Sequence, residues 1–213
     1  EGSPCFLWFL FQKIYASAPG SYSNLPIGKT ERLTEGDSFL NSLFYNDANM
    51  KYDLHNHTHY STCSTFKPLH LLKLAKKIGL DGVAITDHNT LRGGLAVRKL
   101  NRDKDFEVIV GSERYTDRGH VLGLYLHKDI RSRVFEEVIQ EIRQQGGISI
   151  IAHPFRFLPR AYFKREGLSK DSYPDVIECF NSRTAGYANG LARRLAERLD
   201  MPKSAGSDTH FPF

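Results

Sequence analysis

The chain has 213 residues, 40% of them hydrophobic, and a formal net charge of +5 at pH 7. This length can bury one sizeable core, and no apolar stretch reaches the roughly 18 residues that a membrane span needs. Three scattered cysteines without a CxxC pair exclude a disulfide framework and favour a reducing, cytoplasmic setting. Lysine and arginine are also scattered, which favours a solvated surface over a dedicated nucleic-acid patch.

Residues 1–49 differ in composition from the rest of the chain. The apolar run Phe6–Phe11 precedes Ala16-Ser17-Ala18, and residues 19–49 are rich in Gly, Ser, Asn and Pro with no sustained period. The run and the A-x-A triplet resemble the end of a secretory signal, but the run is short and a lysine follows it. We therefore expect residues 1–49 to be a poorly ordered N-terminal extension or linker, or a stretch upstream of the natural product. The ordered domain is predicted over residues 50–213.

Strand and helix patterns alternate from residue 51 onward, which favours an α/β fold. The predicted strands span residues 51–57, 83–86, 107–111, 121–126, 148–152, 175–180 and 203–207. Helices are predicted over 91–102, 131–145 and 185–199, and a further one with Ser64 or Thr65 as its cap and Pro68 in its first turn. Six residues separate Glu113 from His120, too few for a parallel crossover, so the fourth strand is predicted to run antiparallel to the third.

Side chains that bind metals gather at the predicted strand ends. In Asp53-Leu54-His55-Asn56-His57, the two histidines are two positions apart and share one face of a strand. The other candidate ligands are His88, Glu113, His120, His153, Asp208 and His210. Imidazole and carboxylate without thiolate suit zinc, manganese or iron, and a single ion takes about four to six ligands. The set therefore predicts a site for at least two divalent ions.

The chemistry that such a site favours is in-line displacement at phosphorus by a metal-activated hydroxide. Glu113, alone in the middle of the set, is the candidate bridging carboxylate, and His120, His153 and Asp208 complete the candidate catalytic group. Two ions, two carboxylates and a bridging hydroxide leave a charge of about +1, which should attract an anion. Amide hydrolysis is the rival reaction, and it needs this surplus charge less.

Further residues are assigned supporting roles. The candidate contacts for a substrate phosphate, with a place on the surface as the alternative, are Arg156, Arg183, Asn89 and Asn181. Asp53 and Asp87 are predicted to orient the ligating imidazoles from behind.

Together these segments resemble the polymerase-and-histidinol-phosphatase (PHP) family of metal-dependent phosphoesterases. The resemblance covers about residues 50–210 through motifs at Asp53–Thr58, Ile85–Asn89, Gly111–Glu113 with Gly119–Gly123, Ile151–Phe155 and Gly206–His210. Each motif alone is weak, but five in the right order are specific. The resemblance implies a distorted (β/α)7 TIM-like barrel, up to three metal ions in a cleft at the strand ends, and hydrolysis of phosphomonoesters or phosphodiesters.

The sequence departs from the family pattern in two places. Members with three ions carry Asp or His just after the first motif, where this chain has Thr62 and Cys63, so a third ion would depend on His88 and His210. The chain also stops shortly after the last motif, so we expect a barrel truncated at the C-terminus. Two or three ions are therefore expected.

The predicted function is a metal-dependent hydrolase of phosphate esters that acts on a phosphorylated small molecule or a nucleotide. One alternative is an exonuclease or nucleotide phosphatase that acts on nucleic-acid ends. Another is a metal-binding module that keeps the barrel without turnover. The pattern identifies neither the substrate nor the oligomeric state.

Overall fold

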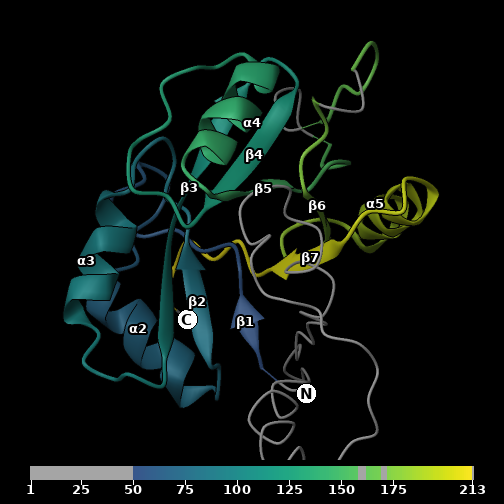
Figure 1. Ribbon diagram of the computed structural model, residues 1–213. Coiled ribbons are helices and arrows are strands. Elements are labelled where there is room, and N and C mark those ends of the chain that lie inside the picture. Colours follow the sequence, from purple (N-terminus) through teal and green to yellow (C-terminus); the bar gives the residue numbers. More distant parts are fainter. Residues whose placement is uncertain (1–49, 158–161, 169–171, 213) are drawn as a thin grey trace, which may run out of the picture.

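The computed structural model describes residues 50–157, 162–168 and 172–212, so the predicted extension over 1–49 lies outside the described residues. Seven strands form one sheet in chain order, β1 to β7 (Figure 1). The strands are β1 (Tyr52–Asp53), β2 (Gly82–Ile85), β3 (Glu107–Thr116), β4 (Gly119–Leu124), β5 (Ile148–Ile151), β6 (Val176–Asn181) and β7 (Lys203–Gly206). The helices are α2 (Pro68–Lys77), α3 (Arg92–Leu100), α4 (Phe135–Gln144) and α5 (Gly186–Arg198).

The sheet is parallel except around β4, which pairs antiparallel with both β3 and β5. This confirms the predicted return after the third strand. The two outer strands approach each other just beyond their ends, where Asp208 N donates to His55 O at 2.8 Å and His57 N donates to Thr209 O at 3.0 Å. These bonds nearly close the sheet into the distorted seven-stranded barrel that the resemblance implies.

The boundaries of two predicted strands differ from the structure in ways that shape the site. β1 has two residues instead of seven, because the backbone from Leu54 onward makes single bonds to both neighbours in place of a ladder. β3 runs on to Thr116, because β4 continues to pair with it after the parallel pairing with β2 ends at Val110. Glu113 therefore lies within a strand, and the prediction that it follows a strand end is wrong.

The predicted cap of the first described helix is also wrong. α2 begins at Pro68, and Lys67 at its N-cap makes no side-chain capping bond. Ser64 instead donates its hydroxyl to the backbone oxygens of His57 (3.1 Å) and His210 (2.7 Å), so it links the two ends of the sheet.

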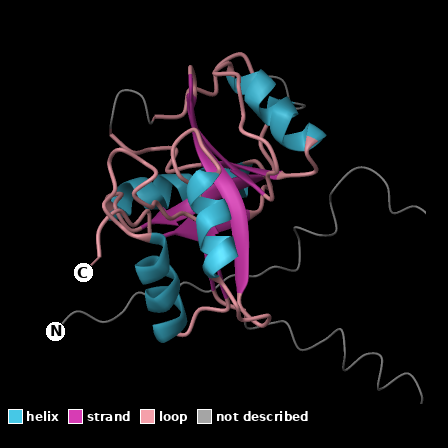
Figure 2. Ribbon diagram, turned by 90° about the vertical axis from the view of Figure 1, so that its left-hand side faces the viewer, coloured by secondary structure: helices cyan, strands magenta, loops and turns pink. Residues whose placement is uncertain are grey.

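The helices cover the outside of the strands (Figure 2). α2 and α3 pack on β2 and β3, α4 on β3 to β5, and α5 on β6. The barrel interior is filled by apolar side chains, one or more from every strand: Tyr52, Ala84, Ile109, Leu122, Ile150, Val176 and Ala205. The interior is therefore a packed core, as in other barrels of this type, and the polar side chains gather at the strand ends. Among the described residues, no helix has both the length and the apolar character needed to cross a bilayer.

Candidate metal centre

The segments that follow β1 and β7 bring three predicted ligands together in the interior. His55 Nε2 and His57 Nε2 lie 3.1 Å apart, and both side chains are fully buried. Asp208 Oδ1 lies 3.5 Å from His55 Nε2 and 3.3 Å from His57 Nε2. Three ligand atoms within this distance of one another can bind a single ion.

The two oxygens of Glu113 face different imidazoles. Oε1 lies 2.8 Å from His120 Nδ1 and 3.2 Å from His153 Nε2. Oε2 lies 3.3 Å from His57 Nε2 and 2.9 Å from His88 Nδ1. The carboxylate thus stands between two groups of ligands, the position that a bridging carboxylate requires.

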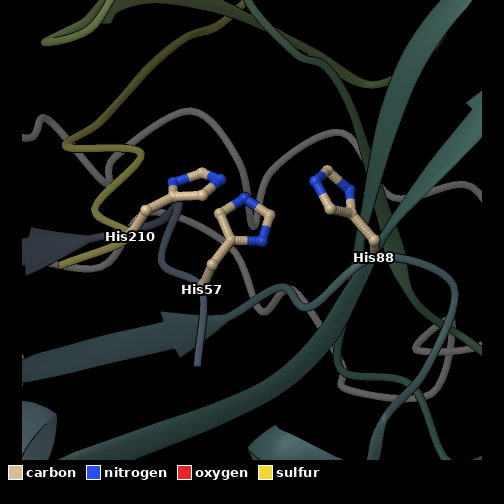
Figure 3. Close-up of side chains that lie close together, drawn as sticks. All are labelled: His57, His88 and His210. Atoms are coloured by element: carbon tan, nitrogen blue, oxygen red, sulfur yellow. The ribbon is translucent and has the colours of Figure 1, made fainter. Parts of the chain in front are cut away.

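His57, His88 and His210 form a further group toward the outside. Figure 3 shows their rings side by side, with His57 between the other two. The ring centre of His57 lies 4.5 Å from that of His88 and 4.3 Å from that of His210. Burial and the neighbouring His57 lower the pKa of His210 to about 4, so its imidazole is neutral at physiological pH and can bind a metal.

All eight predicted ligands therefore meet at one place. Ligand atoms that lie within 4.8 Å of one another form four overlapping groups. The groups are His55, His57 and Glu113; His55, His153 and Asp208; Glu113, His120 and His153; and His57, His88 and His210. Their shared members indicate adjacent positions in one cluster.

Backbone strain is concentrated in the loops that carry the site. Asn89, His153 and Asp208 adopt positive φ values of 58°, 29° and 54° after β2, β5 and β7. Non-glycine residues rarely adopt such values, and they persist only where the surroundings enforce them. Two of the three residues are predicted ligands, so the fold holds ligand side chains at an energetic cost.

Glu178 on β6 is a site residue that the sequence reasoning missed. It is 1% exposed; its Oε1 lies 2.9 Å from His55 Nδ1, and its Oε2 accepts the backbone N–H of His153 at 2.6 Å. A Cβ atom at Gly206 would collide with His55 and come within 2.8 Å of Glu178 Oε1, so a glycine permits this close packing. By engaging Nδ1, Glu178 leaves Nε2 of His55 directed at the cluster, the usual arrangement behind a metal-binding histidine.

Asp53 does not contact an imidazole, so its predicted role is corrected. Its Oδ1 accepts the backbone N–H groups of His55 at 3.2 Å and Ser207 at 2.9 Å. Asp53 therefore fixes the main chain on both sides of the β1–β7 junction. Burial raises the pKa of its carboxyl group.

Asp87 acts on an imidazole through a second residue that the sequence reasoning missed. Ser61 Oγ donates to Asp87 Oδ1 at 2.6 Å and lies 3.3 Å from His57 Nδ1. Ser61 Oγ also accepts the backbone N–H of His88 at 2.9 Å. The Asp87–Ser61 pair therefore leaves Nε2 of His57 directed at the cluster.

The charges of the fully buried Glu113 and His55 strongly affect each other's pKa. Burial alone would raise the pKa of Glu113, but the charge on His55 and hydrogen bonds from neighbouring imidazoles hold it well below its usual value. Burial alone would lower the pKa of His55, but Glu178, Asp208 and Glu113 raise it well above 6.5. Without a metal, protonated imidazoles balance the carboxylates. Divalent ions would replace these protons.

The donor set fits divalent metal ions. It combines neutral nitrogen and anionic oxygen donors, with no thiolate in any of the four groups. Nδ1 of His153 is buried and has no hydrogen-bond partner among the described residues. Buried polar atoms are normally paired, so an unpaired imidazole nitrogen in this cluster is consistent with a ligand awaiting an ion.

The two predicted arginines reach the cluster from its rim. Arg156 donates from Nη1 to Asp208 Oδ2 at 2.7 Å, and its side chain is 19% exposed. Arg183 Nη1 lies 2.7 Å from His210 Nδ1. Both guanidinium groups therefore contact predicted metal ligands.

The remaining predicted residues are placed differently. Asn181 is fully buried; its amide donates to Glu178 at 3.2 Å and its Oδ1 accepts from the Arg183 backbone N–H at 3.0 Å. Asn89 Oδ1 accepts from Arg114 at 2.8 Å. Both amides are thus engaged in holding the protein's own loops. Cys63 is exposed and belongs to none of the four ligand groups, although it hydrogen-bonds His88.

The sequence matches two family profiles and a related protein. The sequence profile of the PHP domain matches residues 53–183, and that of a PHP-associated region matches residues 186–213. An uncharacterized protein of Methanocaldococcus jannaschii, MJ1587, is 39% identical over 158 residues, which are 69% of this chain and 89% of that protein.

Two solved structures share the fold. One is a candidate metal-dependent phosphoesterase from Bifidobacterium adolescentis, with a TM-score of 0.60 and 18% identity over 75% of this chain and 87% of the other. The second is an amidohydrolase from Chromobacterium violaceum with bound sulfate and no metal, with a TM-score of 0.60 and 15% identity over 76% of this chain and 88% of the other.

The profile match and the ligand cluster lead to one assignment. The region that matches the PHP domain contains the predicted ligands from His55 to His153, and the region that matches the PHP-associated profile contains Asp208 and His210. Such a cluster of buried histidines and carboxylates supports a metal-dependent hydrolase. The chain belongs to the PHP-domain family.

Proposed function

We propose that this protein hydrolyses phosphate esters, with two divalent ions of manganese, zinc or iron in the buried cluster and a third at the rim. His55, His57, Asp208 and Glu113 Oε2 would hold one ion, and Glu113 Oε1 would share the second with His120 and His153. When bound, such ions activate water as a nucleophile and neutralise charge that develops on the phosphoryl oxygens. His88 and His210 would hold the third.

The observation that carries the proposal is the pair of guanidinium groups at the rim. Arg156 and Arg183 each place Nη1 2.7 Å from a predicted ligand, on Asp208 and His210 respectively. A guanidinium group binds phosphate oxygens in a bidentate manner and stays charged at every physiological pH. Two of them beside a metal cluster suit a phosphoryl group, whereas an amide substrate offers no anionic oxygen to either cation.

The contacts of His210 indicate that Arg183 is free to move to a substrate. Nδ1 of His210 lies 2.8 Å from the backbone oxygen of Asp208 and 2.7 Å from Arg183 Nη1. One ring nitrogen cannot donate to the carbonyl and accept from the guanidinium at the same time. If Nε2 binds a metal, Nδ1 carries the proton and donates to the carbonyl. The guanidinium then needs another acceptor, and a phosphate oxygen provides one.

Glu178 changes the charge balance expected from the sequence. With two ions, a hydroxide and three buried carboxylates in place of two, the surplus of about +1 disappears. The positive charge that attracts a phosphate then comes from the rim, that is, from the third ion and from Arg156 and Arg183. The recognition of phosphate therefore depends more on the rim than the sequence alone indicates.

The C. violaceum neighbour carries sulfate, a tetrahedral anion like phosphate, on the same fold.

The proposal is tested with protein stripped of metal and reconstituted with Mn²⁺. Wild type should hydrolyse a generic aryl phosphate, and Glu113→Ala should lose this activity together with bound metal. Arg156→Lys should raise KM while metal content stays unchanged, because lysine cannot form the bidentate contact. Arg98→Gln, on the exposed end of α3, serves as the control. Full activity in Glu113→Ala would refute the assignment. Bound metal without hydrolysis across a panel of phosphate esters would select the non-catalytic module.

A further inference from the structure

A cavity of about 440 Å³ lies beside the metal centre at the β3–β4 hairpin. Tyr115 separates the two, because its ring centre lies 4.5 Å from that of His88 and 4.5 Å from that of His120. Tyr115 and Glu113 are two positions apart on β3, so their side chains share a face. The cavity therefore borders the site across Tyr115, and its volume falls in the range of small-molecule pockets.

The outer wall of the cavity is fixed to the protein core. Phe163 is buried, its backbone N–H donates to Pro154 O at 2.9 Å, and its ring centre lies 5.6 Å from that of Phe135. Tyr162 and Lys164 flank Phe163, so the side chains on either side of this anchor are turned away from the core. Both line the cavity.

The cavity has a positive charge that the described residues do not balance. Arg133 and Lys164 line it, and within the described part of the chain neither forms an ion pair with a carboxylate. Asp117 also lines it, and its Oδ1 accepts the backbone N–H of Phe135 at 2.9 Å, at the start of α4. Two cationic side chains thus face one carboxylate, which leaves a net charge of about +1 (+2 − 1).

We propose that this cavity binds a second acidic group on the leaving-group side of the substrate, so that the preferred substrate is a small phosphate ester with two anionic groups. One phosphoryl group would lie at the metal centre beside Arg156 and Arg183. The second acidic group would lie against Arg133 and Lys164, with the connecting atoms packed on Tyr115. Water adds to phosphorus, the ester P–O bond breaks, and inorganic phosphate leaves separately from an alcohol that keeps the second acid.

This inference rests on the proposed function, and the test separates the two. The substrates are alkanediol monophosphates and bisphosphates of three to six carbons, with phosphate release as the readout for the Mn²⁺-loaded protein. Matching ω-carboxyalkyl phosphates show whether a carboxylate can replace the second phosphate. Wild type should prefer a bisphosphate over the monophosphate of the same length by about tenfold or more in kcat/KM, and the best length reports the distance between the two sites.

The decisive variant is Arg133→Gln/Lys164→Gln, which removes both charges and keeps polar side chains. It should lower kcat/KM for the bisphosphate about tenfold, mainly through KM, and leave the monophosphate within about twofold. The control is Arg98→Gln/Lys99→Gln, which removes one arginine and one lysine from the last turn of α3 and should change neither substrate.

Each other outcome has a distinct meaning. Equal kcat/KM for mono- and bisphosphates in wild type, or an equal fall for both in the variant, would overturn the inference and leave the proposed function intact. If no ester is hydrolysed, the proposed function fails. Calorimetric binding of a non-hydrolysable alkane bisphosphonate then decides the inference. Tight binding that the variant loses supports it, and unchanged or absent binding refutes it.

Stronger binding of a 5′-phosphorylated oligonucleotide than of any small bisphosphate would replace the small molecule with a nucleic-acid end.

Discussion

The inner half of the cluster, which would hold two ions, and the outer half, His88 and His210 at the rim, are built differently. In the inner half, His55 and His57 are fully buried, and Glu178 and Ser61 engage their Nδ1 atoms from behind. In the outer half, the side chains of His88 and His210 are 14% and 7% exposed. The difference indicates that the inner half is preorganised to retain an ion, whereas the outer half meets solvent and substrate.

Replacing one histidine from each half should give the largest contrast. His55→Asn should remove at least one ion and lower turnover by more than about 100-fold, beyond the range expected when only an outer-sphere partner is lost. His88→Asn should keep both inner ions and lower turnover about tenfold. Metal content by elemental analysis and steady-state hydrolysis measure both effects. Equal losses of metal in the two variants would contradict the division into halves.

Glu178 should have the next largest effect, because it supports the inner half without belonging to it. Glu178→Gln should weaken metal binding and turnover by about 10- to 100-fold. Glu178→Ala should also destabilise the metal-free protein by about 3 kcal/mol, because it leaves a buried His55 without its partner. The melting temperature should fall by about 6–12 °C.

The matched control is Glu197→Gln on α5. Glu197 is exposed and pairs with Lys203 at 2.8 Å, so its loss should change neither metal content nor melting temperature measurably. Unchanged metal affinity in Glu178→Gln would show that the contact with His55 Nδ1 is incidental.

The ligands and the residues that support them differ in how far the sequence could predict them. Most of the ligands lie in short motifs at strand ends, and parallel strands bring such ends together, so pattern and topology suffice to collect them. Glu178 is a lone acid in an apolar strand, and only its inward position between Ile177 and Cys179 hinted at a function. Asp53 was expected to orient an imidazole because of strand alternation, but β1 ends before the histidines and its carboxylate meets backbone N–H groups instead. Such contacts form only when segments far apart in the sequence meet in the folded barrel, so no local sequence pattern predicts them.

The pH dependence of the metal-free protein should reveal the coupled charges of the inner half. The pKa of Glu113 is depressed, so its stabilising contribution is present above its usual value of 4.5 and is lost as pH falls. The pKa values of His55 and His57 are raised, so their contribution is present below 6.5 and is lost as pH rises through the folded values. The metal-free protein should therefore be most stable between about pH 4.5 and 6.5.

Metal should change the alkaline side of this profile. Ions replace the protons on the histidines, so binding releases protons and tightens as pH rises. At 100 times the Kd, one ion stabilises by about 2.7 kcal/mol, which raises the melting temperature by about 5–10 °C. Melting curves with and without Mn²⁺ at pH 6 and pH 9 should show the larger gain at pH 9. An equal gain at the two pH values would mean that the buried histidines are neutral before metal binds.

The smallest effects are expected at Cys63, which borders the outer half. Cys63→Ser should leave Mn²⁺ content and turnover within about twofold, because the thiol is exposed and outside every ligand group. Cys63→Asp should instead increase retention of Mn²⁺ at the rim, because His57, His88 and His210 include no carboxylate and manganese prefers oxygen ligands. Competition with a chelator at fixed free Mn²⁺ measures this, with the inner ions as the internal reference. A loss of metal in Cys63→Ser would mean that the thiolate already serves as a ligand, and the outer half would then favour zinc over manganese.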